Sequence, residues 1–169
     1  MGIGIPGSGK STVLRQLAEK YDYTYISSDE IRKELTGNET DQSRNKQVWE
    51  ETYKRITQSL QQGKNVVLDR TFVNDFERTK VINFARENGA EKIQGIFVDT
   101  PIEISKERNM ARERKVPEHV IDNMNEMLKR TPPEITDGFD SLFTLDEYQE
   151  LKEAEMLREG EILKKGFKK

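Results

Sequence analysis

Eight residues near the N-terminus constrain the fold of this chain more than any other feature. Residues 4–11 read GIPGSGKS, a full G-x-x-x-x-G-K-[ST] pattern, between a short apolar run and a segment of helical period. Glycines at these positions let successive backbone N–H groups turn inward, and the following helix adds the positive end of its dipole. The pattern therefore predicts a strand, an anion-binding loop and a helix. The alternative, a Gly-rich turn with an incidental lysine, fits this context poorly.

The side chains of this loop suit the phosphates of a nucleotide. Lys10 supplies a mobile positive charge for the β and γ phosphates, and the Ser11 hydroxyl is a hard oxygen ligand for Mg²⁺. Such a loop indicates nucleotide binding but no particular reaction. Residues 45–48 read NKQV and lack the Asp of the guanine motif N-K-x-D. A kinase therefore becomes the leading class by elimination.

Short apolar or β-branched runs alternate with longer charged segments of helical period, which is typical of helices packed on a parallel sheet. Strands are expected at 1–5, 23–27, 65–69, 93–99 and 141–145. Helices are expected at 10–20, 29–35, 42–62, 75–88, 102–112 and 117–129. Right-handed crossovers between such strands predict a three-layer α/β sandwich.

The length of 169 residues favours a single compact domain, against about 150 residues for a typical one. We expect this domain to span 1–145, followed by a charged helix or tail at 146–169, with no partner domain. The chain has 28 basic and 31 acidic residues, a net charge of −3, and a pI near 5.5. Dedicated nucleic-acid-binding domains have a pI above about 9, so any contact with nucleic acid must be local.

Cysteine is absent, which excludes disulfides, Cys-ligated zinc, iron–sulfur clusters and thiol nucleophiles. The one histidine, His119, cannot form a His-rich metal site, and we expect it to be a surface or packing residue. No apolar run approaches the roughly 18 residues of a membrane span, and the N-terminus has no secretory leader pattern. We therefore expect a cytoplasmic protein without a membrane partner.

Polar residues follow the second and third expected strands, at the edge where open α/β sheets bind ligands. Asp29 can accept a proton from an attacking hydroxyl, or it can cap the next helix. Arg32, on the same helical face, can bind an anionic group of the acceptor, or remain a solvated surface charge. Asp69 ends a wholly apolar strand, so it can support Mg²⁺, orient Arg32, or simply cap the next element.

Residues 108–115 read RNMARERK, with four basic residues against one acidic residue, and are expected to form a basic lid. Arg108 and Arg112 are spaced i, i+4, so on a helix they project from one face. Lid arginines can stabilise the charge of a transferring phosphoryl group while excluding water. The alternative is a solvated basic helix that pairs with Glu107 and Glu113.

Four segments together resemble the kinase domain of polynucleotide 5′-hydroxyl kinases and related P-loop kinases, including zeta-toxin-like and seryl-tRNA kinases. They are GIPGSGKST at 4–12, SSDEIR at 27–32, LDRT at 68–71, and RNMAR at 108–112 before VP at 116–117. The resemblance spans about 1–145 and implies the P-loop NTPase fold, a five-stranded parallel sheet in the order 2-3-1-4-5. One departure is that Arg-Thr-Phe follows Asp69, where relatives more often have a small residue and then Thr-Asn.

The resemblance also implies roles for individual residues. Asp29 would be the general base, Arg32 would hold the acceptor phosphate, and Asp69 would support that arginine or the metal. Nucleotide phosphates would lie at Gly7, Ser8, Gly9, Lys10, Ser11, Thr12, Arg108 and Arg112. We therefore expect a kinase that uses ATP and Mg²⁺, with Lys10 and the arginines, Arg112 among them, stabilising charge.

The expected acceptor is the 5′-hydroxyl of a nucleic-acid end, DNA or RNA. Two alternatives stay open. A nucleoside or sugar kinase fits the acidic pI, and Arg32 also permits it if that small acceptor carries an anion. A nucleotide-dependent regulatory ATPase fits if Asp29 is only a helix cap.

Overall fold

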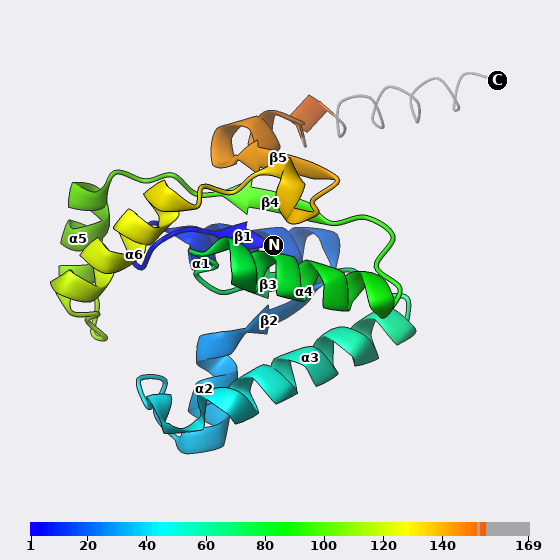
Figure 1. Cartoon of the computed structure of the whole chain (residues 1–169), viewed down its shortest axis with the longest axis horizontal. Coiled ribbons are helices and arrows are strands. Elements are labelled where there is room, and N and C mark those ends of the chain that lie inside the picture. The colour runs from blue at the N-terminus through cyan, green and yellow to red at the C-terminus, as the bar shows by residue number, and fades with distance from the viewer. Residues whose placement is uncertain (152, 155–169) are drawn as a thin grey trace.

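The computed structural model describes residues 1–151, 153 and 154 (Figure 1). Its centre is one parallel sheet in the order β2-β3-β1-β4-β5, which confirms the predicted topology. The strands are β1 (Gly2–Ile3), β2 (Thr24–Ser27), β3 (Val66–Asp69), β4 (Gln94–Phe97) and β5 (Ser141–Thr144). β1 is shorter than the predicted 1–5, although the backbone N–H of Gly4 still donates to Thr71 after β3.

Six α-helices and two short 3-10 helices are described between the strands. They are α1 (Lys10–Tyr21), α2 (Ser28–Thr36), η1 (Gln42–Arg44), α3 (Asn45–Gln61), α4 (Asp75–Glu87), α5 (Ile102–Met110), α6 (Glu118–Arg130) and η2 (Ile135–Asp137). The predicted helix at 42–62 is divided into η1 and α3. The predicted helix at 102–112 ends two residues early, which matters for the lid arginines described below.

The sheet has an apolar cluster on each face, as a three-layer sandwich requires. Neighbouring residues of β3 point to opposite faces, as the two-residue period of a strand dictates. Leu68 packs with Val48 of α3 and Val81 of α4, whereas Val67 packs with Leu14 of α1. Figure 1 shows α3 and α4 alongside the sheet, with α5 and α6 together at one end of it.

Local signals place the helix beginnings that matter for the site. The Ser27 hydroxyl caps α2 by accepting from the backbone N–H of Glu30, and Asn74 caps α4 by accepting from Glu77. Such caps satisfy N–H groups that have no partner within the helix. α2 therefore begins directly at the end of β2, so its first turn stands at the carboxyl edge of the sheet.

A buried arginine that the sequence analysis did not single out joins several segments beyond β3. Arg78 of α4 is fully buried and pairs with Asp137 of η2 at 2.6 Å. It also donates to the carbonyls of Phe72, Thr131 and Pro132. A buried guanidinium is tolerated only when its charge and donors are satisfied, so this network fixes the ends of α4 and α6.

The predicted C-terminal segment 146–169 lies mostly outside the described residues. Residues 145–151 are helical, and Tyr148 is buried in the cluster that contains Leu14 and Leu17 of α1. This first part of the segment therefore packs on the sheet domain. None of the helices in the described part of the chain is long and apolar enough to cross a bilayer.

Candidate active site

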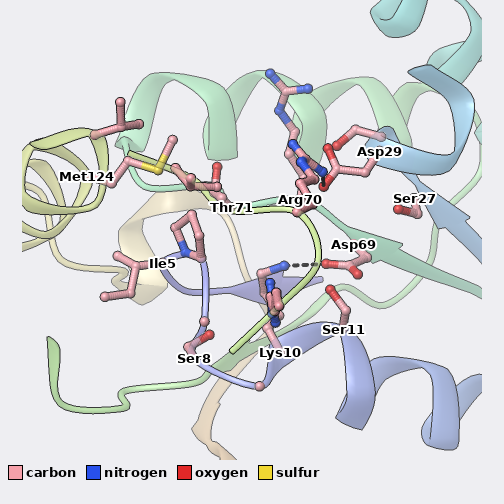
Figure 2. Close-up of a pocket in the computed structure, with 18 of the residues that line it drawn as sticks. Ile5, Ser8, Lys10, Ser11, Ser27, Asp29, Asp69, Arg70, Thr71 and Met124 are labelled. Carbon is pink, nitrogen blue, oxygen red and sulfur yellow. Dashed lines mark hydrogen bonds and ion pairs between the residues drawn. The ribbon is translucent and has the colours of Figure 1, made fainter. Parts of the chain in front are cut away.

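A pocket of about 250 Å³ lies at the carboxyl ends of β1, β2 and β3 (Figure 2). The phosphate loop, residues 4–12, forms one wall, and residues from α2, the end of β3 and α6 form the others. Its charged lining residues are Lys10, Asp29, Arg32, Asp69, Arg70, Arg112 and Arg114. The structure therefore brings most of the predicted site residues into one cavity, at the edge where parallel sheets bind ligands.

Two glycines give the phosphate loop its shape. Gly7 and Gly9 have φ angles of 84° and 93°, a region that side chains with a Cβ rarely adopt. A Cβ on Gly7 would also lie 2.0 Å from the carbonyl oxygen of Ser105 in α5. The loop thus needs glycine at residue 7 for both conformation and space, and α5 packs directly against it.

Lys10 reaches across the pocket to Asp69 at the end of β3, and both side chains are buried. Asp69 also accepts a hydrogen bond from the Tyr25 hydroxyl at 2.5 Å, and Ser11 lies within hydrogen-bonding reach. Burial alone would raise the pKa of Asp69. The Lys10 charge and the hydrogen bonds from Lys10, Ser11 and Tyr25 outweigh it and hold that pKa below its ordinary value.

Burial and the charge of Asp69 also raise the pKa of Tyr25, so its hydroxyl stays protonated and remains a donor. Asp69 is therefore a buried carboxylate held by Lys10 and Tyr25. The alternative that it simply caps the next element does not account for these partners. Among the described residues, no hydrogen bond or ion pair joins Asp69 to Arg32, so the structure does not bear out the expectation that Asp69 orients this arginine.

The donor atoms around Asp69 fit Mg²⁺. The Ser11 hydroxyl and the Asp69 carboxylate are hard oxygen ligands, and Figure 2 shows them facing each other beside Lys10. In phosphoryl-transfer sites Mg²⁺ takes one or two protein ligands together with phosphates and water. Within the described residues, no group of three or more His, Cys, Asp or Glu side chains is placed to hold a metal ion. A metal ion at Ser11 and Asp69 would therefore take its other ligands from phosphate and water.

Asp29 stands in the first turn of α2, where the cap residue is Ser27. The alternative that Asp29 caps the helix is therefore wrong. Its side chain is about half exposed, and both carboxylate oxygens face arginines. Oδ1 accepts from Arg32 at 2.6 Å, and Oδ2 accepts from Arg114 at 2.7 Å.

Arg32 is only 5% exposed, so the alternative of a solvated surface charge is also wrong. Besides Asp29, its guanidinium donates to the carbonyl of Glu39 and to the side chain of Asn45 at the start of α3. Its Nε is buried without a hydrogen-bond partner in the described residues. The turn from α2 to α3 therefore fixes Arg32 in the pocket wall.

The basic segment 108–115 begins in the last turn of α5 and continues as a loop that reaches over the pocket before α6. Asn109 is buried, and its side chain both donates to the carbonyl of Val116 and accepts from its N–H, which closes the loop. Lys106 of α5 pairs with Asp122 of α6 at 2.6 Å. The loop is thus held at its two ends, while the arginines between them face the pocket.

The two predicted lid arginines do not share a helical face, because α5 ends at Met110 and Arg112 lies in the loop. Arg108 donates to the carbonyl of Ser8 at 3.2 Å and so packs on the phosphate loop from outside the pocket. Arg112 lines the pocket without any side-chain hydrogen bond or ion pair to the described residues. The i, i+4 spacing predicted a common helical face for Arg108 and Arg112. The helix instead ends between them, next to Asn109, whose side chain is hydrogen-bonded to the backbone of Val116.

The site contains functional candidates that the sequence analysis missed. Arg114 binds Asp29, and its only sequence signal was membership of the basic segment. Arg70 follows Asp69 directly and lines the pocket, with its guanidinium 3.9 Å from the ring centre of Trp49. Thr12, predicted to bind phosphate, is exposed in the first turn of α1 and does not line the pocket.

Comparison with known proteins agrees with this geometry. A family model described as an AAA domain matches residues 1–131. A protein of Acanthamoeba polyphaga mimivirus that carries the name of a bifunctional polynucleotide phosphatase/kinase is 30% identical over 111 residues, 65% of this chain. The L-seryl-tRNA(Sec) kinase of Methanococcus maripaludis is 26% identical over 137 residues, 73% of this chain. These matches cover 23% and 49% of those proteins, so the chain corresponds to only part of each.

Solved structures share the fold at lower identity. A chain of the Pnkp1/Rnl/Hen1 RNA repair complex matches 77% of this chain and 43% of its own length, with a TM-score of 0.69 and 20% identity. A gluconokinase from Sinorhizobium meliloti matches 84% of this chain and 78% of its own length, with a TM-score of 0.56 and 20% identity. With the family model covering most of its length, the chain belongs to the AAA domain family.

Proposed function

We propose that this protein is a kinase that uses ATP and Mg²⁺ to phosphorylate a hydroxyl group, and that the acceptor is the 5′-hydroxyl of a polynucleotide. The observation that carries the proposal is the Asp29–Arg32 pair, which stands in the same pocket as Lys10 and the phosphate loop. A carboxylate to activate a hydroxyl and a cation to hold its anionic neighbour are what this transfer needs. The relative named for a polynucleotide phosphatase/kinase supports this acceptor, and the relative named for an L-seryl-tRNA(Sec) kinase supports the kinase reaction.

The phosphate loop and the lid bind the donor. Backbone N–H groups at residues 7–9 and the positive end of α1 hold the phosphates. Lys10 places its positive charge beside the γ-phosphoryl group. Ser11 and Asp69 hold Mg²⁺, which when bound neutralises part of the phosphate charge. Arg112 faces the same space and stabilises charge that spreads over the transferring group. The 111–116 loop keeps water away from it.

Asp29 acts on the acceptor. The hydroxyl oxygen attacks the γ-phosphorus, a new O–P bond forms, and the bond to the ADP oxygen breaks. The proton of the hydroxyl passes to the Asp29 carboxylate. Arg32 fixes that carboxylate at 2.6 Å and binds the acceptor anion, while Arg114 withdraws from Oδ2 to admit the hydroxyl.

A second candidate, a kinase for a small anionic alcohol such as a sugar acid, is favoured by two observations. The chain has a net charge of −3, which gives no long-range attraction for nucleic acid. The pocket of about 250 Å³ is also small. Arg32 would then bind the carboxylate or phosphate of the small acceptor.

Transfer of label from [γ-³²P]ATP with Mg²⁺ tests both candidates. The acceptors are 5′-hydroxyl DNA, 5′-hydroxyl RNA, seryl-tRNA, thymidine and gluconate, each with wild type, Asp29→Ala and a Glu30→Gln control. Glu30 is the next residue in the same turn and does not line the pocket. We expect label on oligonucleotide 5′ ends with wild type and Glu30→Gln, and none with Asp29→Ala.

Label on gluconate alone would favour the small-acceptor kinase instead. Release of free phosphate at equal rates by wild type and Asp29→Ala, with no acceptor labelled, would overturn the kinase proposal and leave a regulatory ATPase.

A further inference from the structure

Arg70 is the charged residue of the pocket that the proposed reaction leaves without a task. It follows Asp69 at the end of β3, and Figure 2 shows it among the residues that line the cavity with Asp29. Its side chain is 18% exposed. Its nearest carboxylate is that of Glu77 in α4, at 3.5 Å, which is a longer contact than those that Asp29 makes with Arg32 and Arg114.

The rest of its surroundings hold Arg70 in place without using its donors. Its guanidinium lies 3.9 Å from the ring centre of Trp49, and Trp49 stacks on Tyr53 with ring centres 5.4 Å apart. Tyr53 in turn packs on Phe84 of α4, with ring centres 4.3 Å apart. A cation over an aromatic face is stabilised by the ring quadrupole, yet its N–H groups remain available for hydrogen bonds. The aromatic stack therefore braces the guanidinium while leaving its fork free to bind.

Two arginines of this pocket have buried donors with no acceptor. The Nε atoms of Arg32 and Arg70 are both buried without a hydrogen-bond partner in the part of the chain that the structure describes. Buried donors are nearly always paired, and exceptions point to a ligand or ion. Both groups belong to cations, so an anion bound beside these guanidinium groups would match their charge.

The charges of the pocket lead to the same result. Its lining holds five cationic side chains and two carboxylates, Asp29 and Asp69. Asp69 pairs with Lys10, and Asp29 is shared by Arg32 and Arg114. On the acceptor side, three guanidinium groups and one carboxylate line the cavity, and Glu77 and Glu39 lie beside Arg70 and Arg114 at 3.5 and 3.8 Å without lining it. The lining itself therefore presents more positive than negative charge to an acceptor.

We propose that Arg70, braced by Trp49, is a second acceptor-binding residue beside Arg32, and that the two guanidinium groups select an acceptor with a phosphate next to the hydroxyl that is phosphorylated. This inference rests on the proposed kinase function, which it makes more specific. Guanidinium forks match the oxygens of a phosphate in pairs, so two of them give geometric selection as well as charge. A nucleoside 3′-phosphate has the required combination of groups.

Trp49 is the only tryptophan of the chain, so its fluorescence reports directly on Arg70. With ADP and Mg²⁺ present, the protein is titrated with thymidine 3′-phosphate, thymidine and gluconate. We expect a saturating change in Trp49 emission with thymidine 3′-phosphate and none with thymidine. In Arg70→Gln the apparent affinity should fall about 10- to 100-fold, the range for a hydrogen bond between charged groups.

Labelling kinetics with the same acceptors separate a binding role from a structural one. We expect wild type to prefer thymidine 3′-phosphate over thymidine in kcat/KM. Arg70→Gln should lose about 10- to 100-fold of this preference, through a higher KM for thymidine 3′-phosphate, and Arg70→Lys should restore part of it. Lys80→Gln, which removes an exposed charge of α4, is the matched control and should behave as wild type.

The outcomes distinguish this inference from the function on which it rests. If 5′-hydroxyl acceptors are labelled but Arg70→Gln keeps the full preference for the phosphate, the assignment of Arg70 is overturned and the kinase stands. If no acceptor is labelled but thymidine 3′-phosphate still changes Trp49 emission in an Arg70-dependent way, the anion site stands and the kinase does not. Arg70-dependent binding of gluconate with no response to the phosphate would overturn the choice of phosphate.

Discussion

The phosphate loop and the acceptor side line the same pocket, but different kinds of structure build them. The loop is one continuous stretch of backbone, shaped by Gly7 and Gly9 and closed against α5. The acceptor side, formed by Asp29, Arg32, Arg70 and Arg114, consists of side chains from three separate stretches of the chain. These stretches are α2, the end of β3 and the loop before α6.

This difference explains how one scaffold can keep its donor and change its acceptor. Backbone N–H groups bind phosphate whatever the neighbouring side chains are, so the shape of the loop depends on the positions of its glycines, and Lys10 adds the charge. Side chains that converge from distant segments can be replaced one at a time. We therefore expect substitutions in the loop to affect every acceptor equally, and substitutions on the acceptor side to affect acceptors selectively.

The largest effect should come from Lys10→Met. We expect phosphoryl transfer to every acceptor to fall by about 10³-fold or more, because a charge aimed at the transferring group is lost. The free energy of unfolding should also fall by about 3 to 5 kcal/mol, because Asp69 is left as an unpaired buried charge. Labelling assays and urea unfolding measure the two effects.

The double variant Lys10→Met/Asp69→Asn separates these two effects. It removes the unpaired charge, so most of the lost stability should return while transfer remains absent. Stability that stays low in the double variant would mean that the Lys10–Asp69 pair does not account for the loss.

Asp29→Asn should have the next largest effect, and on the acceptor side only. The amide keeps the shape of the side chain but cannot take the proton of the hydroxyl, so transfer should fall about 10²- to 10³-fold. ATP affinity, measured by calorimetry, should not change. A loss of ATP affinity equal to the loss of transfer would show that the two sides of the pocket are not separable in this way.

The fold was predictable because its signals are local and repeat along the chain. Alternating apolar runs and charged helical segments predicted a parallel sheet covered by helices, and the resemblance of its motifs to known kinases implied the strand order. The end of α5 was not predictable, because it coincides with hydrogen bonds between Asn109 and Val116, seven residues apart. The spacing of Arg108 and Arg112 in the sequence gives no sign of these hydrogen bonds.

The site was predictable to the extent that a motif carries it. Lys10, Ser11, Asp29, Arg32 and Asp69 all line one pocket, as their positions in the motifs predicted. The burial of Arg32 and the bracing of Arg70 depend on side chains of α3, which lie next to them only in the folded chain. Such contacts between distant segments leave no pattern in a single sequence.

A third effect, of moderate size, should come from loosening the loop that covers both sides. Asn109→Ala leaves the backbone N–H and carbonyl of Val116 without their side-chain partner. We expect transfer to fall about tenfold while hydrolysis of ATP by water rises relative to transfer, because an open lid admits water. Met110→Ala, an exposed change in the next residue, should leave the ratio of hydrolysis to transfer unchanged.

The smallest effect should come from Tyr25→Phe, which tests where the boundary between the two sides lies. Asp69 is reached by Lys10 from the phosphate loop and by Tyr25 from β2, the strand that leads into α2. The phenylalanine ring can still lie near Arg15, 4.9 Å from the present ring, so the change removes chiefly the donor to Asp69. We expect a loss of about 1.5 kcal/mol in unfolding free energy and about threefold in transfer.

The pattern of that threefold loss identifies the side to which Asp69 belongs. If Asp69 serves the donor through Lys10 and Mg²⁺, Tyr25→Phe lowers transfer to thymidine and to thymidine 3′-phosphate by the same factor. If Asp69 instead positions the acceptor, the two factors differ. Equal factors would extend the donor side as far as the end of β3, so that Asp69 and Arg70, consecutive in sequence, serve opposite partners of the reaction.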